Sequence, residues 1–339
     1  MRILWIRLRS LGDILLNLPA LDALKRVAPD AHVTYVVHPE YAALLEDYPS
    51  IDRLAFVSRG ARGYLHIVLR RSPWLREEYE WAINFHGGHM SALIALWSHS
   101  REKIGLRRFR GQWIYTQTVD DVMVGRPLHT VDVQARLLTP LIGPIDRNQL
   151  RPPRFPALHR PPGPRVQQWL QWRGDRPFVL VHPGARFRWK RWPYARTYTL
   201  FREWVQRWTG ITFGVFTGPC ERDLPIEDWC ITPERVFLIH QWSLPEVMHL
   251  LRRTDVYVGF DNGITHLAAL LGCPVIAIWG PVDPARWAPW TDLKILLHAP
   301  DGNVDAVTNE AVTQALHMML EATLYGTHRF RFISRPDTG

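Results

Sequence analysis

The stretch that decides the fold is Val256-Tyr257-Val258-Gly259-Phe260-Asp261-Asn262-Gly263-Ile264-Thr265-His266-Leu267-Ala268-Ala269. It begins as a short apolar run, passes through a polar turn and continues as an apolar segment that suits a helix. An apolar strand that leads directly into a helix is typical of a parallel sheet covered on both faces. In such sheets ligands bind beyond the carboxyl ends of the strands, so the turn at 261–263 is a candidate binding site.

The same alternation of strand, loop and helix recurs throughout the chain. Further strands are expected at 178–181, 212–216 and 275–278 in the second half, and at 3–6, 32–37 and 81–85 in the first. Eight prolines lie between residues 140 and 164, and proline disfavours both helices and central strands. The sequence therefore predicts an α/β protein with two doubly wound domains, at 1–150 and 177–339, joined by a proline-rich linker region at 151–176.

The composition is that of a folded globular protein. The chain has 339 residues, 47% of them hydrophobic, and this length favours two domains over one. No apolar stretch reaches the roughly 18 residues of a membrane helix, and Arg7, Arg9 and Asp13 interrupt the apolar core that a signal peptide would need. The three cysteines form no C-x-x-C pair, which excludes a disulfide framework and a zinc ribbon. We expect a cytoplasmic protein without a metal site.

The net charge of +9 is unevenly distributed. Residues 1–139 have a net charge of +4, residues 140–176 of +5, and residues 177–339 are neutral. A basic surface attracts nucleic acid, anionic lipid or an anionic substrate, and charge alone does not select among them.

The loop after the first strand contains Gly12 and Asp13. Gly12 allows a tight turn and the close approach of a ligand. Asp13 falls where the next helix begins, so it could cap that helix, or it could accept a proton at the mouth of a binding site. Position alone favours capping.

Cations and carboxylates follow the strands of the second half. His182 and Gly184 lie directly after the strand at 178–181, and Lys190 follows ahead of a helix expected near residue 193. A glycine-bearing loop with clustered cations is a plausible phosphate cradle, although the pattern of a P-loop is absent. A solvated basic loop is the alternative interpretation. Glu221, after the strand at 212–216, could accept hydrogen bonds from a ribose or be an ordinary surface carboxylate.

The turn at 261–263 has the densest group of polar residues. Backbone amides at the start of its helix, together with the helix dipole, suit a diphosphate. Asp261 and His266 place a hydrogen-bond acceptor and a titratable group on either side of this helix N-terminus. A single histidine would more often be a core residue, but the presence of Asp261, Gly263 and Thr265 in the same turn favours a ligand site.

Three groups of residues resemble the signatures of glycosyltransferase family 9, the ADP-heptose:lipopolysaccharide heptosyltransferases. They are Arg9-Ser10-Leu11-Gly12-Asp13-Ile14 with Leu18-Pro19-Ala20, then His182-Pro183-Gly184-Ala185 with Lys190-Arg191-Trp192-Pro193, then Asp261-Asn262-Gly263 with Thr265-His266-Leu267-Ala268-Ala269 and Trp279-Gly280-Pro281. The resemblance covers nearly the whole chain. It implies the GT-B fold, in which two Rossmann-like doubly wound domains face each other across a cleft. The N-terminal domain would bind the acceptor and the C-terminal domain the nucleotide-sugar donor.

The resemblance also implies roles for individual residues. Asp13 would be the general base in an inverting, metal-independent displacement, which reverses the preference for capping. Lys190 would offset the charge of the departing diphosphate, Asp261 would hold sugar hydroxyls and Glu221 the ribose. The implied donor-binding residues are His182, Gly184, Lys190, Glu221, Ser243, Asp261, Asn262, Gly263, Thr265 and His266.

The implied partners are ADP-heptose as the donor and the anionic lipopolysaccharide core as the acceptor. No cofactor is expected, and a cytoplasmic protein of this kind can make peripheral contact with the inner membrane. The positive charge of residues 1–176 would then steer the acceptor towards the protein. The acceptor-binding candidates are Gly12, Arg59, Arg62, Arg107, Arg108 and Arg110.

Departures from the family pattern leave alternatives open. Asn262 stands where threonine is usual, and His240 and Trp242 replace a glycine and a threonine ahead of Ser243. These changes allow another nucleotide sugar or another acceptor. A third hypothesis is a non-catalytic basic protein that binds nucleic acid or other anions. A pure binder has no need for Asp13 and Lys190, so we expect no nucleic-acid partner.

Overall fold

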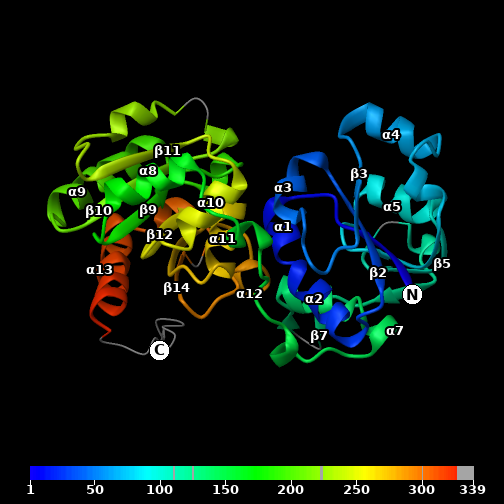
Figure 1. Cartoon of the computed structure of the whole chain (residues 1–339). Coiled ribbons are helices and arrows are strands. Elements are labelled where there is room, and N and C mark those ends of the chain that lie inside the picture. Colours follow the sequence, from blue (N-terminus) through cyan, green and yellow to red (C-terminus); the bar gives the residue numbers. More distant parts are fainter. Residues whose placement is uncertain (110, 124–125, 222–223, 300, 327–339) are drawn as a thin grey trace. The chain divides into compact units, whose positions relative to one another are not determined.

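The computed structural model describes residues 1–109, 111–123, 126–221, 224–299 and 301–326. The chain divides into two compact units, Met1–His159 and Arg160–Gly339. Each unit contains one six-stranded parallel sheet with flanking helices (Figure 1). The α/β class predicted from the sequence is confirmed.

In the first unit the strand order is β3-β2-β1-β4-β5-β6. The strands of this sheet are β1 (Arg2–Ile6), β2 (His32–Val37), β3 (Arg53–Phe56), β4 (Glu78–Asn84), β5 (His99–Leu106) and β6 (Gln117–Val119). Its helices are α1 (Leu11–Leu15), α2 (Leu18–Val27), α3 (Ala42–Leu45), α4 (Gly60–Val68), α5 (His89–Trp97), α6 (Thr130–Arg136) and α7 (Thr139–Ile142). A short antiparallel pair, β7 (Val122–Met123) and β8 (Arg126–Pro127), lies outside the sheet.

The second unit repeats this topology with the strand order β11-β10-β9-β12-β13-β14. The strands are β9 (Phe178–His182), β10 (Thr212–Thr217), β11 (Val236–His240), β12 (Val256–Phe260), β13 (Val275–Trp279) and β14 (Lys294–His298). The helices are α8 (Pro164–Arg173), α9 (Tyr194–Arg207), α10 (Leu244–Leu251), α11 (Gly263–Leu270), α12 (Pro284–Trp287) and α13 (Asn309–Tyr325).

The central strands are buried on both faces. Every residue of β9, β12 and β13 is buried, and so are four of the five residues of β1. Because successive side chains of a strand point to opposite faces, this burial requires helices on each side of the sheet. Within the described residues, none of the helices combines the length and the apolar character needed to cross a lipid bilayer.

The strand order determines where a ligand can bind. In each unit the direction of winding reverses between the first and fourth strands, β1 and β4 or β9 and β12. In doubly wound sheets a ligand typically binds at the carboxyl edge of the sheet, where the loops after these two strands run in opposite directions. Each unit therefore has one expected binding position.

The linker region and the number of strands differ from the sequence-based expectation. The division between the units falls inside the predicted linker 151–176, and part of that linker forms α8. Pro164 is tolerated there because it occupies the first turn, where its missing amide is not needed. The strands β3, β5, β6, β11 and β14 were not predicted. β5 begins with five polar or charged residues, His99–Lys103, so no apolar run marks its start. β3, β6, β11 and β14 are the edge strands of the two sheets. β3 and β6 are short, whereas β11 and β14 carry apolar runs of the same kind as the predicted strands.

Candidate functional site

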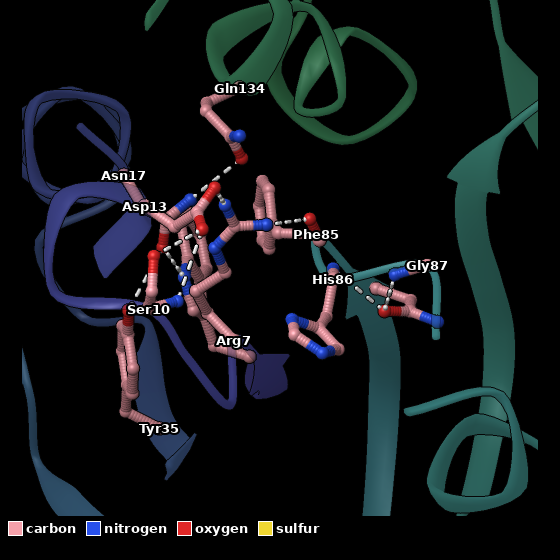
Figure 2. Close-up of polar contacts among 11 residues, drawn as sticks. Arg7, Ser10, Asp13, Asn17, Tyr35, Phe85, His86, Gly87 and Gln134 are labelled. Atoms are coloured by element: carbon pink, nitrogen blue, oxygen red, sulfur yellow. Dashed lines mark hydrogen bonds and ion pairs between the residues drawn. The ribbon is translucent and has the colours of Figure 1, made fainter. Parts of the chain in front are cut away.

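In the first unit, the polar residues after β1 converge on Asp13 (Figure 2). Ser10 precedes α1, and its backbone amide and hydroxyl donate to Asp13 Oδ2 at 3.1 Å and 2.8 Å. Asp13 is thus part of the N-terminal cap of α1, as its position suggested. A quarter of its side chain remains exposed, so the carboxylate is also open to a ligand.

The guanidinium of Arg7 fixes the second oxygen of this carboxylate. Arg7 follows β1 directly, is only 5% exposed and forms an ion pair with Asp13 Oδ1. It also donates to the Phe85 carbonyl in the loop after β4. Burial raises the pKa of the Asp13 carboxyl, but the Arg7 charge and the Ser10 hydrogen bonds outweigh burial and hold that pKa below its ordinary value. Asp13 is therefore ionised at neutral pH.

His86 lies beside this pair at the end of β4 (Figure 2). The Asn84 side chain holds the loop in place, because its Oδ1 accepts hydrogen bonds from the backbone amides of His86 and Gly87 at 3.0 Å and 3.2 Å. Burial and the nearby Arg7 lower the pKa of His86 to about 4, so its ring is neutral at neutral pH. Among the described residues, Nδ1 of this ring is buried without a hydrogen-bond partner. A neutral imidazole with an unused nitrogen can hold a water or a substrate hydroxyl.

A buried polar network supports α1 from behind. Asn17 Oδ1 accepts from Trp5 Nε1 at 2.5 Å and from the Tyr35 hydroxyl at 3.2 Å, and its amide donates to Gln134 at 2.9 Å. These bonds connect the turn between α1 and α2 to β1, β2 and α6. Asp13 is consequently presented by a segment that is fixed at both ends.

In the second unit, Lys190 and Asp261 form an ion pair across the carboxyl edge of the sheet. Lys190 ends a 3-10 turn in the loop after β9, and Asp261 directly follows β12. Both side chains are largely buried, with 18% and 8% exposed. Just ahead of Lys190, the rings of Phe187 and Trp189 stack at 5.4 Å and remain exposed. The loop thus combines a held cation with a flat apolar surface.

Glu221 and His182 form a second, deeper pair. His182 Nε2 lies 3.5 Å from Glu221 Oε2, which also accepts the Gly218 amide at 2.9 Å. Burial raises the pKa of Glu221, but the His182 ring and the Gly218 amide outweigh burial and hold it below its ordinary value. A side-chain carbon on Gly184 would lie 2.1 Å from Glu221 Oε1, so only glycine fits there. The predicted residues His182, Gly184 and Glu221 are brought together.

Asn262 is the N-cap of α11. Its Oδ1 accepts the amides of Ile264 and Thr265 at 2.9 Å and 3.0 Å, and its Nδ2 donates to the Gly184 carbonyl at 2.9 Å. Because the amides of Ile264 and Thr265 already donate to Asn262 Oδ1, a phosphate at this helix N-terminus would bind the preceding backbone amides, those of Asn262 and Gly263. Threonine could cap the helix as well, but it has no amide with which to hold the loop after β9.

Three other predicted donor-binding residues serve the protein itself in this structure. Thr265 is fully buried and donates to the Phe260 carbonyl at 2.5 Å. Ser243 caps α10 through its bonds to Glu246. His266 is buried, with its ring edge-on to Trp279 at 6.1 Å. We assign Thr265 and His266 to the support of the site because both side chains are buried. Ser243 is exposed, and its hydroxyl donates to Glu246 Oε2 at 2.8 Å.

The unusual residues ahead of Ser243 have identifiable contacts. His240 Nδ1 lies 2.8 Å from the Thr217 hydroxyl, which joins the ends of β10 and β11. Trp242 packs edge-on against Phe237. Both are therefore explained locally by the packing of this edge of the sheet.

The predicted acceptor-binding arginines lie on the first unit and are mostly paired. Arg59 forms an ion pair with Glu40, Arg107 with Asp120 and Arg108 with Asp121. Arg62, on α4, is exposed and has no ion pair with any described residue. Gly12 is buried within α1. Arg110 lies outside the described residues.

Sequence reasoning missed Arg7, His86 and the Phe187–Trp189 stack. The strand order could have revealed Arg7 and His86, because the loops after 3–6 and 81–85 both lie at the switch point of a doubly wound sheet. Among the described residues, no group of three or more histidines, cysteines or carboxylates could hold a metal ion.

Comparison with known proteins gives consistent results. Residues 69–316 match the family described as glycosyltransferase family 9 (heptosyltransferase). The chain is 25% identical over 311 residues to lipopolysaccharide heptosyltransferase 3 of Escherichia coli, which covers 87% of this chain and 88% of that protein.

Solved structures share the fold. A family 9 glycosyl transferase of Veillonella parvula superposes with a TM-score of 0.77 and 19% identity, over 94% of this chain and 97% of that one. The E. coli heptosyltransferase WaaC, in a structure with ADP-2-deoxy-2-fluoro heptose, gives a TM-score of 0.72 and 21% identity over 94% and 99%. These similarities confirm the GT-B fold class predicted from the sequence.

Proposed function

Because this chain belongs to glycosyltransferase family 9, we propose that it is an inverting heptosyltransferase with Asp13 as its general base. The donor is ADP-heptose and the acceptor is a hydroxyl of the lipopolysaccharide inner core. The similarity to E. coli lipopolysaccharide heptosyltransferase 3 supports this choice of substrates. We assign the acceptor to the unit Met1–His159 and the donor to the unit Arg160–Gly339.

The observation that best supports the proposal is the state of Asp13. Its carboxylate is ionised and partly exposed, and among the described residues three hydrogen bonds are made to it, two to Oδ2 and one to Oδ1. A carboxylate has about four lone-pair positions, so Oδ1 retains one for a proton. Since the reaction inverts configuration, a single displacement with one base is sufficient. The acceptor oxygen bonds to the anomeric carbon, the bond to the diphosphate breaks, and the proton passes to Asp13.

The second unit offers positive groups for the charge that develops on the leaving ADP. Lys190 and the amides of Asn262 and Gly263 lie at the carboxyl edge of the sheet, where the diphosphate would bind. Asp261, once released from Lys190, can accept bonds from sugar hydroxyls. The Phe187–Trp189 stack supplies a flat surface against which a nucleobase can pack. We propose that these groups act without a metal ion.

The decisive experiment is identification of the product. The purified chain is incubated with ADP-heptose and a panel of truncated lipopolysaccharides, and the products are analysed by mass spectrometry and by NMR of the new anomeric centre. The expected result is the addition of one heptose with inversion. Parallel thermal-shift measurements with ADP-sugars and UDP-sugars test the donor. Preferential stabilisation by a UDP-sugar would exclude ADP-heptose as the donor.

The proposed acceptor also predicts where in the cell the protein works. A glycolipid acceptor is held in a bilayer, so the proposed enzyme works in the cytoplasm in peripheral contact with the inner membrane. Fractionation of cells into soluble and membrane pools, with and without a salt wash, tests this location.

A further inference from the structure

Helix α4 exposes an apolar stripe on the outside of the first unit. Tyr64, Leu65, Val68 and Leu69 are 39%, 52%, 49% and 46% exposed, and they lie on α4 and the residue that caps it. Single exposed apolar residues are ordinary on protein surfaces, but four on one helix form a continuous patch. We call this patch the α4 stripe.

Helical geometry shows that the α4 stripe lies on the side of the helix opposite the side that packs against the first unit. The inner face of α4 is defined by Gly63 and Ile67, which are buried. A side-chain carbon on Gly63 would lie 1.8 Å from the Ser58 carbonyl oxygen, so the helix already packs closely on that side. At about 100° per residue, the stripe falls on the opposite side of the helix. α4 also contacts α5, its neighbour in Figure 1. The stripe therefore faces away from the unit to which α4 belongs.

Positive charge surrounds the stripe. The segment 59–76 contains five arginines, at positions 59, 62, 70, 71 and 76, and no acidic residue. Arg59 pairs with Glu40, and the Arg70 guanidinium lies 4.4 Å from the centre of the Trp97 ring. Arg62 and Arg71 are exposed and form no ion pair with a described residue. Apolar and cationic groups thus share one surface, and among the described residues Glu40 is the one carboxylate that forms an ion pair with these five arginines.

The apolar side chains and the arginines together indicate which kind of partner the α4 stripe binds. An apolar helix face with flanking arginines is typical of helices that lie in the interface of an anionic bilayer. A second copy of the chain is disfavoured, because pairing two stripes would also bring two groups of arginines together. We propose that the α4 stripe and its arginines dock on an anionic lipid surface, with the apolar side chains at the boundary between headgroups and acyl chains. The proposal needs neither the donor nor the acceptor, so it can be tested apart from the proposed function.

Vesicle co-sedimentation of the full chain tests the proposal. One set of vesicles is phosphatidylcholine alone, and the other is phosphatidylcholine and phosphatidylglycerol in equal parts. We expect binding to the anionic vesicles that weakens as salt is added, since salt screens the arginines. Arg71→Gln should weaken that binding about fivefold. Leu65→Ser with Leu69→Ser should weaken it about 25-fold, because each half-exposed leucine contributes about fivefold and the two factors multiply.

A matched control uses Leu293, which is 41% exposed in the second unit. Leu293→Ser should bind vesicles as the unchanged protein does, and all variants should unfold at about the same temperature because the altered side chains are exposed. Absence of binding to anionic vesicles, or equal binding by the Leu65→Ser/Leu69→Ser variant, would overturn the proposal. A concentration-dependent dimer that this variant abolishes, without vesicle binding, would assign the stripe to a second copy instead.

Transfer to a water-soluble truncated acceptor separates this proposal from the proposed function. If the stripe variant loses vesicle binding and retains transfer, both proposals stand. If the unchanged protein transfers heptose but does not bind anionic vesicles, the docking surface is wrong and the function stands. If the unchanged protein binds anionic vesicles but transfers no heptose, the docking surface stands and the proposed function is wrong.

Discussion

Replacing Asp13 with asparagine separates two roles that the carboxylate combines, helix cap and general base. Asparagine preserves the size of the side chain and one oxygen, which can still accept from the Ser10 amide and hydroxyl. It removes the negative charge and places an NH2 donor beside Arg7, which has only donors to offer. The cap can therefore persist while the base is lost.

The expected losses differ in size. A general base typically contributes about 10²–10⁴-fold, so kcat should fall by that factor, equivalent to about 3–5.5 kcal/mol. Breaking a buried ion pair costs about 3–5 kcal/mol of the free energy of unfolding. Because a quarter of Asp13 is exposed and Arg7 keeps its bond to the Phe85 carbonyl, we expect a smaller cost here, about 2–3 kcal/mol.

The assay is the initial rate of heptose transfer at saturating donor, with thermal unfolding measured on the same preparations. The matched control is Ser10→Ala, which removes the 2.8 Å hydroxyl bond to Asp13 and leaves the Arg7 pair intact. It should cost about 1 kcal/mol of stability and change kcat by only a few-fold. If Asp13→Asn retains kcat within about tenfold, or if Ser10→Ala loses as much rate, Asp13 is only a cap and the proposed mechanism is wrong.

Three further predictions concern Lys190, the pH profile and Gly184. Lys190→Gln should lower kcat by about 10²–10³-fold in the transfer assay, because it removes a fixed charge from the leaving group; unchanged turnover would place the diphosphate elsewhere. Because the pKa of Asp13 is lowered, its carboxylate stays ionised as the pH falls, and its contribution to stability is present above the unfolded value of 3.8 and lost only below it. kcat/KM should therefore show no acid limb from this group between about pH 7 and about pH 5, and a limb centred in that range would point to a different base. Gly184→Ala should displace Glu221 and cost about 1–3 kcal/mol in thermal unfolding, whereas Gly218→Ala, whose new carbon would lie 3.4 Å from Glu221 Oε2, serves as the milder control.

The fold was predictable because the central strands are buried on both faces and therefore uniformly apolar. The segments 3–6, 178–181 and 275–278 correspond to β1, β9 and β13 within a residue or two. β5 was missed because it begins with five polar or charged residues, His99–Lys103, and no local pattern reveals that it lies between β4 and β6. Strand order depends on contacts between distant segments, which a local pattern does not contain.

The candidate site was predictable in its location and less so in its contacts. Lys190 and Asp261 were both selected from loops after strands, but their mutual ion pair was not expected. Asn262 was interpreted as a change in donor preference, whereas it caps α11 and holds the loop after β9. Arg7 was considered only as an interruption of the apolar N-terminus. Arg7 can be buried because its guanidinium pairs with Asp13 and donates to the Phe85 carbonyl. The contact with Phe85 forms only in the tertiary structure, so the local sequence does not indicate it.

The Lys190–Asp261 ion pair makes donor binding in the proposed reaction an exchange of counter-ions. In the free protein the lysine already has an anion beside it, so the arriving diphosphate replaces a carboxylate and not water. The displaced Asp261 becomes available to the sugar at the same moment. When ADP leaves, the two side chains can pair again, and no cation is left buried alone. Product release thus restores an interaction of the resting enzyme, which favours repeated turnover over tight retention of the spent nucleotide.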